Sequence, residues 1–523
     1  MEHKKNTKFA IIITILCIVN FLLSGFLSTE AKQQKSELFS NLPTVQYPNF
    51  HELGMNDGWP QVYDGGDEDM AYGIVIDSNG NVTVTGYSLN TSSNRYNALT
   101  IQYDTDGNEL WKNPLQNGGY TAAIDIAVDS YNNLIILGWS GTTLADLINL
   151  TGEIFIVKYN NKGVEQWNIS LHKDKYIYPG GITVDSHDNI IITGWTGNDL
   201  TKSCWTIKMD NNGQELWNKT YHEDMEDYGI DISIDSYDTI ITAGFWTVPG
   251  SGGTFIIKYA SNGSMLWTKR PIAEINQALS PYAVTVDLND NIILSGEKYS
   301  YTTYTNVMCT QKFDSSGSLL WTREYNSGYT DIAKAVTVDT HNHIIVGGWS
   351  SFSTLENIEQ CVVIYNEDGN ELCIKRPGIQ GQIFDVAVHD DKIFITGYIT
   401  NGNSSDYYID KYLDVTPPSV TLNKPKENYL YIFDRLALPR IRSTTTNTIM
   451  LGKITETITA TNPSDIDKAE FYVDTILKET VNASPFQWVW NEVAFGGQHQ
   501  VKIMVYDHSG CIKKFEFTVR KFL

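Results

Sequence analysis

Basic side chains are scarce in this chain. Its 523 residues include 38 Lys and Arg against 61 Asp and Glu, which gives a formal net charge of −23 at pH 7. Because such a surface repels phosphate backbones, no nucleic-acid partner is expected. The same charge gives no electrostatic attraction to anionic lipid. It suits a soluble domain outside the cell, or one that attracts cations.

The signatures of common catalytic sites are also missing. The chain has no Gly-x-Ser-x-Gly, no His-Glu-x-x-His, no phosphate-binding loop and no Cys-x-x-Cys. Its 10 histidines are scattered. These absences favour a protein that binds or scaffolds over an enzyme.

Long apolar runs are absent after residue 30. Before it, Lys4, Lys5 and Lys8 precede an apolar stretch that reaches Leu27, with small residues near its end. A basic segment, an apolar segment and a small-residue exit form a secretory signal. The stretch 9–27 is also nearly long enough to anchor the chain in a membrane as a hydrophobic helix. Residues 1–31 are therefore predicted to be a signal peptide or a signal anchor and residues 32–56 a linker, with the remainder exported.

Seven copies of a repeat of about 52 residues fill residues 57–414. The copies share the pattern apolar-Asp-x-x-x-x-apolar-x-x-x-Gly, and most carry a later apolar-x-Lys-aromatic, a turn and a Trp. The motif Asp recurs at Asp77, Asp129, Asp185, Asp235, Asp287 and Asp339, with His389 in the seventh copy. The Trp recurs at Trp111, Trp167, Trp217, Trp267 and Trp321, with Cys373 in the sixth copy.

Turn residues divide each copy into four short apolar strands, which predicts an all-β, seven-bladed β-propeller. The seventh copy stops before its Trp strand, whereas Trp59 precedes Trp111 by one repeat length. The N-terminal strand is therefore expected to complete blade seven. The repeats resemble the prokaryotic β-propeller repeats called SBBP, a resemblance that implies an exported propeller and little about activity.

Residues 415–523 are predicted to form a second domain. Pro417-Pro418 marks the linker, and the later segments alternate apolar and polar residues as strands do. The motifs Phe471-Tyr472-Val473-Asp474 and Val505-Tyr506-Asp507 resemble those of immunoglobulin-like modules of microbial surface proteins. The resemblance implies an Ig-like β-sandwich.

The cysteines suggest one cross-link. Cys361 and Cys373 fall on either side of a predicted hairpin, and Cys373 replaces the repeat Trp. Because export permits disulfides, a Cys361–Cys373 bond is one expectation and two buried thiols are the other. Cys204, Cys309 and Cys511 have no obvious mates.

The tight turns of the repeat are interpreted as structural elements rather than as cofactor sites. Their Asp, Asn and Gly residues suit Asx turns, and a calcium loop is the weaker alternative because the segments are too short for an EF-type site. The recurring Trp is interpreted as a packing residue rather than a sugar platform. No cofactor and no metal site is predicted.

Loops that differ between copies are the expected place for a ligand. An acidic, Tyr-rich rim that can meet a cation, a glycan or a basic partner is predicted from Asp69, Asp227, Asp331, Tyr120, Tyr228 and Tyr329. The alternative is a solvated rim with no ligand. Glycosylation is permitted at eight sequons, Asn81, Asn90, Asn149, Asn168, Asn218, Asn262, Asn403 and Asn482.

Together these features predict an extracellular or cell-surface binding or scaffold protein, secreted or tethered by its N-terminal segment. Its partner would be a protein or glycan of the cell envelope. The alternative is an extracellular polysaccharide lyase or hydrolase that uses rim carboxylates.

Overall fold

The structure is a computed structural model that describes residues 58–523. The segments it leaves out of that range are 116–118, 144–145, 147–151, 172–175, 199–200, 224–225, 249–250, 272–276, 301–304, 352–357, 391, 402–403, 414–418, 426–428, 433, 435, 440–447, 462, 493–494, 508–510 and 523. The predicted signal or anchor, the linker and the sequons Asn149 and Asn403 lie outside the described residues. No helix in the described part is long and apolar enough to cross a membrane.

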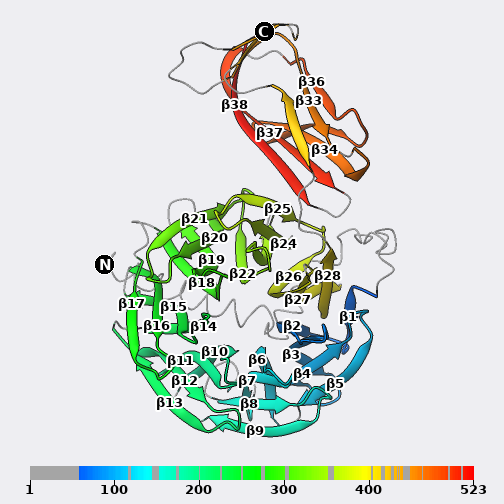
Figure 1. The fold of residues 1–523 in the computed structure, drawn as a ribbon. Helices are drawn as coiled ribbons and strands as arrows, with labels where there is room; N and C mark the ends of the chain where they lie inside the picture. The colour runs from blue at the N-terminus through cyan, green and yellow to red at the C-terminus, as the bar shows by residue number, and fades with distance from the viewer. Residues whose placement is uncertain are drawn as a thin grey trace, which may run out of the picture. The chain divides into compact units, whose positions relative to one another are not determined.

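The chain divides into two compact units. The first ends at Lys411, and the second contains Tyr412–Leu523 together with Val363–Tyr365 and Asn370–Pro377. The first unit consists of antiparallel four-stranded sheets arranged around a centre, as in a β-propeller (Figure 1).

Each repeat supplies one sheet whose strands follow one another from the centre outward. The first sheet has β2 (Asp69–Ile76), β3 (Val82–Asn90), β4 (Arg95–Tyr103) and β5 (Glu109–Leu115). The second has β6 (Tyr120–Val128), β7 (Leu134–Gly141), β8 (Glu153–Tyr159) and β9 (Glu165–Leu171). The third has β10 (Tyr176–Val184), β11 (Ile190–Gly197), β12 (Lys202–Met209) and β13 (Glu215–Tyr221). The fourth has β14 (Glu226–Ile234), β15 (Ile240–Val248), β16 (Ser251–Tyr259) and β17 (Met265–Lys269), and one parallel bridge joins it to the third.

The remaining sheets complete the ring. The fifth has β18 (Gln277–Val286), β19 (Ile292–Ser300), β20 (Thr305–Phe313) and β21 (Leu319–Tyr325). The sixth has β22 (Asp331–Val338), β23 (Ile344–Ser351), β24 (Ile358–Tyr365) and β25 (Glu371–Lys375). The seventh has β26 (Gly381–His389), β27 (Lys392–Asn401), β28 (Ser404–Leu413) and the early strand β1 (Gln61–Tyr63).

The N-terminal strand closes the ring, as the repeat spacing predicts. β1 pairs antiparallel with β28, with Tyr63 opposite Tyr407. Trp59 is 6% exposed and packs edge-on against Tyr103 and Phe394, so it joins the first sheet to the last. The innermost strands contact one another in cyclic order, and β26 contacts β2.

The motif Asp forms the predicted Asx turn. Asp185 Oδ1 accepts the backbone N–H groups of His187 and Asn189, 2.9 Å from each. The turn also joins adjacent sheets. Ser186 of the third sheet donates its N–H and its hydroxyl to the two carboxylate oxygens of Asp238 in the equivalent turn of the fourth sheet. The same link runs from Ser130 to Asp188 and from Ser236 to Asp290.

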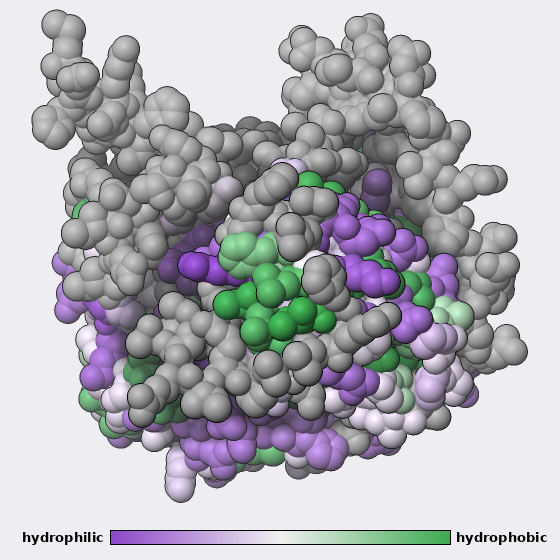
Figure 2. Space-filling model, turned by 90° about the horizontal axis from the view of Figure 1, so that it is seen from above, coloured by the Kyte–Doolittle hydropathy of each residue, from purple (hydrophilic) through white to green (hydrophobic). Residues whose placement is uncertain are grey.

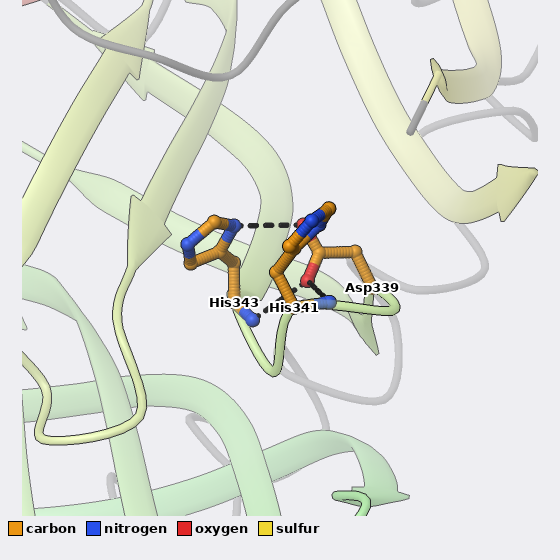
Figure 3. Close-up of side chains that lie close together, drawn as sticks. All are labelled: Asp339, His341 and His343. Carbon is orange, nitrogen blue, oxygen red and sulfur yellow. Dashed lines mark hydrogen bonds and ion pairs between the residues drawn. The ribbon is translucent and has the colours of Figure 1, made fainter. Parts of the chain in front are cut away.

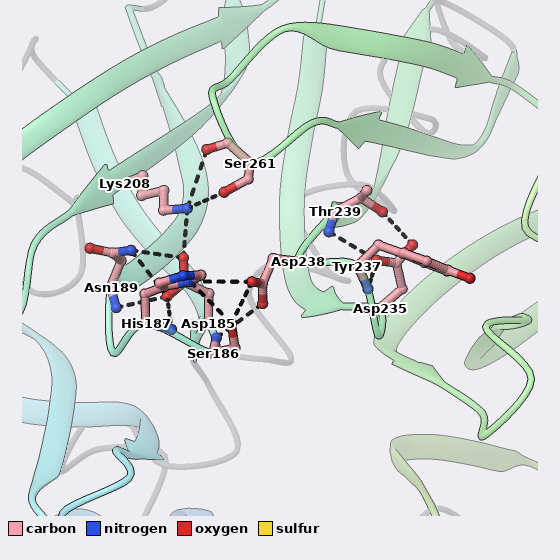
Figure 4. Close-up of polar contacts among 10 residues, drawn as sticks. All are labelled: Asp185, Ser186, His187, Asn189, Lys208, Asp235, Tyr237, Asp238, Thr239 and Ser261. Carbon is pink, nitrogen blue, oxygen red and sulfur yellow. Dashed lines mark hydrogen bonds and ion pairs between the residues drawn. The ribbon is translucent and has the colours of Figure 1, made fainter.

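A buried ion pair explains the motif lysine. Lys208 Nζ lies 2.6 Å from Asp185 Oδ2, and it also donates to the backbone oxygen and the hydroxyl of Ser261 in the next sheet (Figure 4). Lys208 thereby binds the Asp185 turn of its own sheet and the Ser261 turn of the adjacent sheet. Equivalent pairs are Lys158–Asp129, Lys258–Asp235 and Lys312–Asp287.

The repeat Trp packs between sheets. Trp217 is half-buried and donates its indole N–H to the Ser261 carbonyl of the next sheet. Two reasons favour glycine at position 263 in this turn. A Cβ there would lie 2.7 Å from the Trp217 indole, so only glycine lets the turn approach the ring this closely, and the backbone φ is +80°.

The second unit holds two further sheets. One contains β29 (Val420–Lys424), β33 (Ile454–Ala460) and β36 (Gln487–Trp490). The other contains β30 (Tyr429–Ile432), β31 (Leu436–Pro439), β32 (Thr448–Leu451), β34 (Ile466–Val473), β35 (Ile476–Val481), β37 (Phe495–Asp507) and β38 (Ile512–Phe522). A 3-10 turn, Pro463–Asp465, precedes β34. Phe471, Trp490 and Ile503 are among the buried side chains of its core, as the alternating pattern predicts for an Ig-like sandwich.

The predicted Cys361–Cys373 disulfide is wrong. Cys373 is bonded to Cys511, with their Cα atoms 5.3 Å apart, and both belong to the second unit. The repeat gives the reason, because Cys361 takes the place of Phe155 and Cys373 that of Trp167. Those positions lie three residue pairs apart along the β8–β9 ladder, about 10 Å at the rise of a strand. Cys361 lies buried in the first unit.

Candidate functional site

The three predicted rim aspartates are buried rather than presented to solvent. Asp69, Asp227 and Asp331 are each 0% exposed. Each accepts the backbone N–H of the residue four positions earlier, at 2.5 to 2.8 Å, and so closes the loop that leads into an innermost strand. The prediction that they form an open acidic rim fails because this loop uses the carboxylate as an internal cap.

The surroundings of these three carboxylates differ. Asp227 forms an ion pair with Arg270, and Asp331 accepts the hydroxyl of Ser350 at 2.5 Å. Asp69 lies instead with Asp64 and Asp406, and oxygens of the three carboxyls lie within 4.8 Å of one another. Two of the three predicted tyrosines are not on an open surface either: Tyr228 is 3% exposed and stacks on Phe245, and Tyr120 is half-buried, whereas Tyr329 is 48% exposed.

Ring closure creates the Asp64–Asp69–Asp406 cluster. Tyr63 pairs with Tyr407, so the antiparallel register brings Asp64 opposite Asp406. Burial raises the pKa of Asp69 to about 6, the Ser88 hydroxyl and the Gly65 N–H oppose that rise, and the charges of Asp406 and Asp64 add to it. Sequence reasoning found Asp69 but missed its two neighbours. Extending the predicted pairing of the N-terminal strand by one residue pair would have found them.

A hollow of about 260 Å³ adjoins this cluster in the first sheet. Polar groups dominate its lining, which consists of Tyr63, Gly65, Ser88, Leu89, Asn90, Thr91, Ser92, Asn97, Leu99 and Pro114. Hydroxyls and amides are present and no basic side chain is among them, so the hollow suits a neutral or cationic polar ligand. The hollow adjoins Asp69 because two of its lining residues, Gly65 and Ser88, donate hydrogen bonds to that carboxyl.

A second carboxylate group lies on the innermost strands. Asp125, Asp231 and Asp385 each accept an N–H from the innermost strand of the following sheet, from Ile182, Val284 and Ile74 respectively. Burial raises the pKa of Asp125 to about 7 and that of Asp231 to about 8. These side chains join neighbouring strands and have no matching motif in the remaining copies, which is why the repeat did not point to them.

The described sequons fall into two groups. Asn168, Asn262 and Asn482 are exposed. Asn81 donates its amide to Asp77 Oδ2 within a repeat turn, and Asn90 and Asn218 are half-buried. Glycosylation at these positions remains a prediction.

Hydrophilic side chains surround a smaller hydrophobic area on the face shown in Figure 2. Exposed large apolar side chains among the described residues of the second unit include Ile476, Leu477, Val489 and Phe522.

Comparison with known proteins supports the two-part architecture. Residues 440–503 match the model of a bacterial Ig domain. A stretch of 148 residues is 26% identical to an uncharacterised WD repeat-containing protein of Acanthamoeba polyphaga mimivirus, covering 25% of this chain and 10% of that protein.

Solved structures resemble the chain at low identity. The extracellular domain of a hybrid two-component system from B. thetaiotaomicron is 11% identical with a TM-score of 0.41, over 87% of this chain and 56% of that one. The polysaccharide lyase Uly1 is 12% identical with a TM-score of 0.44, over 70% and 94%. The β-propeller domain of the Trilobed protease from Pyrococcus furiosus is 10% identical with a TM-score of 0.39, over 65% and 94%. The strand pairing of the chain itself shows an all-β protein with repeated four-stranded sheets, and its C-terminal part matches the bacterial Ig domain model.

Proposed function

We propose that this chain is a cell-surface binding protein whose first sheet recognises a neutral or amino sugar of a glycan. The hollow beside Asp69 carries the proposal. Its volume of about 260 Å³ is at the small end of ligand pockets, which suits one sugar ring rather than a long groove-bound chain.

The chemistry of the lining favours a polyol. Asn90 and Asn97 supply amides, and Ser88, Thr91 and Ser92 supply hydroxyls, so the lining offers both donors and acceptors to sugar hydroxyls. The nearby carboxyls of Asp64 and Asp69 would attract an ammonium and repel a uronate.

The same features make binding the better proposal than polysaccharide cleavage. A lyase must neutralise the carboxylate of a uronic acid, for which a basic side chain or a metal is needed. No basic residue lines the hollow in the described part of the chain, and Asp69 is held by its own loop.

Two observations support a place outside the cell. The Cys373–Cys511 bond is typical of oxidising compartments, and the C-terminal match is to a bacterial Ig domain. We propose that the N-terminal segment exports or tethers the protein and that an envelope glycan is its partner.

A glycan array with neutral, amino and uronic sugars tests the proposal. The variant Asn97→Ala should bind at least tenfold more weakly than the wild type, because it loses a polar group of the hollow. Asn198→Ala, an exposed residue after β11 in the corresponding loop of the third sheet, is the matched control and should bind normally. Binding that survives Asn97→Ala, or a preference for uronic sugars, would contradict the proposed site. Turnover of any glycan would favour the enzyme.

A further inference from the structure

The turn of the sixth sheet departs from the turns of its neighbours. In the second, third, fourth and fifth sheets, a lysine lies within 3 Å of the buried motif aspartate. In the sixth copy, the lysine position is Ile364 and the motif aspartate is Asp339. The residue four positions after the aspartate, Asn or Thr in the first five copies, becomes His343.

Two histidines therefore gather around a buried carboxylate. Asp339 is 4% exposed, and its Oδ1 accepts the N–H groups of His341 and His343. Its Oδ2 lies 2.8 Å from His343 Nδ1. Figure 3 shows the His343 imidazole facing the carboxylate with the His341 ring beside it. The two rings are nearly parallel, with an interplanar angle of 22°.

Replacing the lysine does not by itself require histidine. The first sheet also lacks the lysine, because Gln102 stands there, and its turn keeps an asparagine, with Asn81 donating its amide to Asp77. A neutral amide thus satisfies a buried aspartate of this turn. The pair of imidazoles in the sixth turn needs another explanation.

We propose that Asp339, His341 and His343 bind a divalent transition-metal ion such as Zn²⁺. One carboxylate oxygen and one nitrogen from each histidine all lie within 4.8 Å of one another. Two ligands of one tetrahedral Zn²⁺, each about 2.1 Å from it, lie about 3.4 Å apart. His343 Nδ1 and Asp339 Oδ2 are already closer than that, and the exposed His341 needs only a small side-chain movement.

The ligand types and the surroundings fit this ion. Two imidazoles and one carboxylate form a borderline set that suits Zn²⁺, Co²⁺ or Ni²⁺ better than Ca²⁺ or Mg²⁺. The backbone N–H groups that bind Oδ1 fix the carboxylate and leave Oδ2 for the metal. Three protein ligands leave a coordination position for water or for a partner's side chain. The ion would supply the positive charge that lysine supplies in four other sheets.

Titration of the full-length protein with Co²⁺ tests the site, because tetrahedral Co²⁺ has strong visible absorption bands. The wild type should bind one equivalent at this site, and Zn²⁺ should displace the Co²⁺. His341→Ala should weaken binding at least tenfold with no change in Tm without metal, because His341 is exposed.

The chain provides a matched control. His187 occupies the same position of the turn in the third sheet, where Asp185 keeps Lys208. His187→Ala should bind Co²⁺ like the wild type. A double variant, Ile364→Lys with His343→Asn, restores the residues of the other copies and should fold while losing the absorption bands. No Co²⁺ binding by the wild type, or equal binding by wild type and His341→Ala, overturns the proposal and makes His343 a simple partner of Asp339.

Discussion

Replacing Lys208 with methionine tests how the repeat stabilises the ring. The Lys208 and Asp185 side chains are 3% and 1% exposed, and the ammonium lies 2.6 Å from the carboxylate. Methionine keeps the apolar stem and removes the charge. Asp185 would then be a buried carboxylate whose remaining hydrogen bonds come from Asn189 and His187.

The expected cost follows from this geometry. Removing one partner of a buried ion pair costs about 3–5 kcal/mol. The remaining hydrogen bonds to Asp185 place the cost near the lower end, about 3 kcal/mol. For a cooperative unit of about 350 residues, the entropy of unfolding is about 0.7 kcal/mol/K, so Tm should fall by about 4 °C.

The pKa of Asp185 gives a second measurement. Burial alone would raise this pKa, but hydrogen bonds from Lys208 and Asn189 outweigh burial and lower it. Because the folded pKa lies below the unfolded value of 3.8, the stability from this pair is present above pH 3.8 and is lost as pH falls through the folded pKa. Lys208→Met should reduce that loss at acid pH.

Thermal unfolding followed by circular dichroism from about pH 2 to about pH 8 measures both effects. Lys162→Met changes an exposed lysine in the turn before β9 and is the matched control, with no expected change in Tm. Adding Asp185→Asn to Lys208→Met should recover part of the stability, because no buried charge then remains unpaired. The reasoning is refuted if Lys208→Met behaves like Lys162→Met or if the double variant is less stable than the single variant.

Three further predictions concern other parts of the chain. A non-reducing peptide map should link the Cys373 and Cys511 peptides. Because Cys511 is buried, Cys373→Ser should make Cys511 reactive to thiol reagents once the protein is denatured, whereas Cys511 of the denatured wild type should stay unreactive; a link to any other cysteine would contradict the structure. Burial raises the pKa of Glu456 from 4.5 to about 8, so between these values the folded state keeps a proton that the unfolded state loses, and the protein loses stability as pH rises through this window. Glu456→Met should therefore raise Tm more at pH 9 than at pH 5. Equal gains at both pH values would refute a buried ionisation. Gly263→Ala should destabilise the ring by more than Gly378→Ala in urea unfolding, since both glycines have positive φ but only the first would contact an indole; equal losses would show that backbone conformation alone matters.

The repeat spacing was sufficient to predict the arrangement of the first unit. Period and turn chemistry are local properties, so the Asx turn at Asp185 and its successors follow from the order of residues alone. The missing Trp strand of the last copy and the extra Trp59 likewise predicted the β1–β28 pairing. The C-terminal motifs predicted an Ig-like domain through their resemblance to modules of microbial surface proteins, and the match to a bacterial Ig domain agrees with that prediction.

Contacts between distant residues were decided only by tertiary structure. Cys373 is bonded to Cys511 across a separation of 138 residues, whereas local hairpin reasoning favoured the nearer Cys361. Asp69 gains Asp406 as a neighbour only when the ring closes. Whether its carboxylate caps a loop or faces solvent depends on burial, which sequence position does not reveal.

The sequence by itself determined the number of repeats, their turns and the way the ring ends meet, because each copy has the same order of apolar and turn-forming residues. Tertiary structure determined which departures from the repeat meet in space. His341 and His343 are two ordinary substitutions in the chain, and only the folded turn places both beside the buried carboxylate of Asp339.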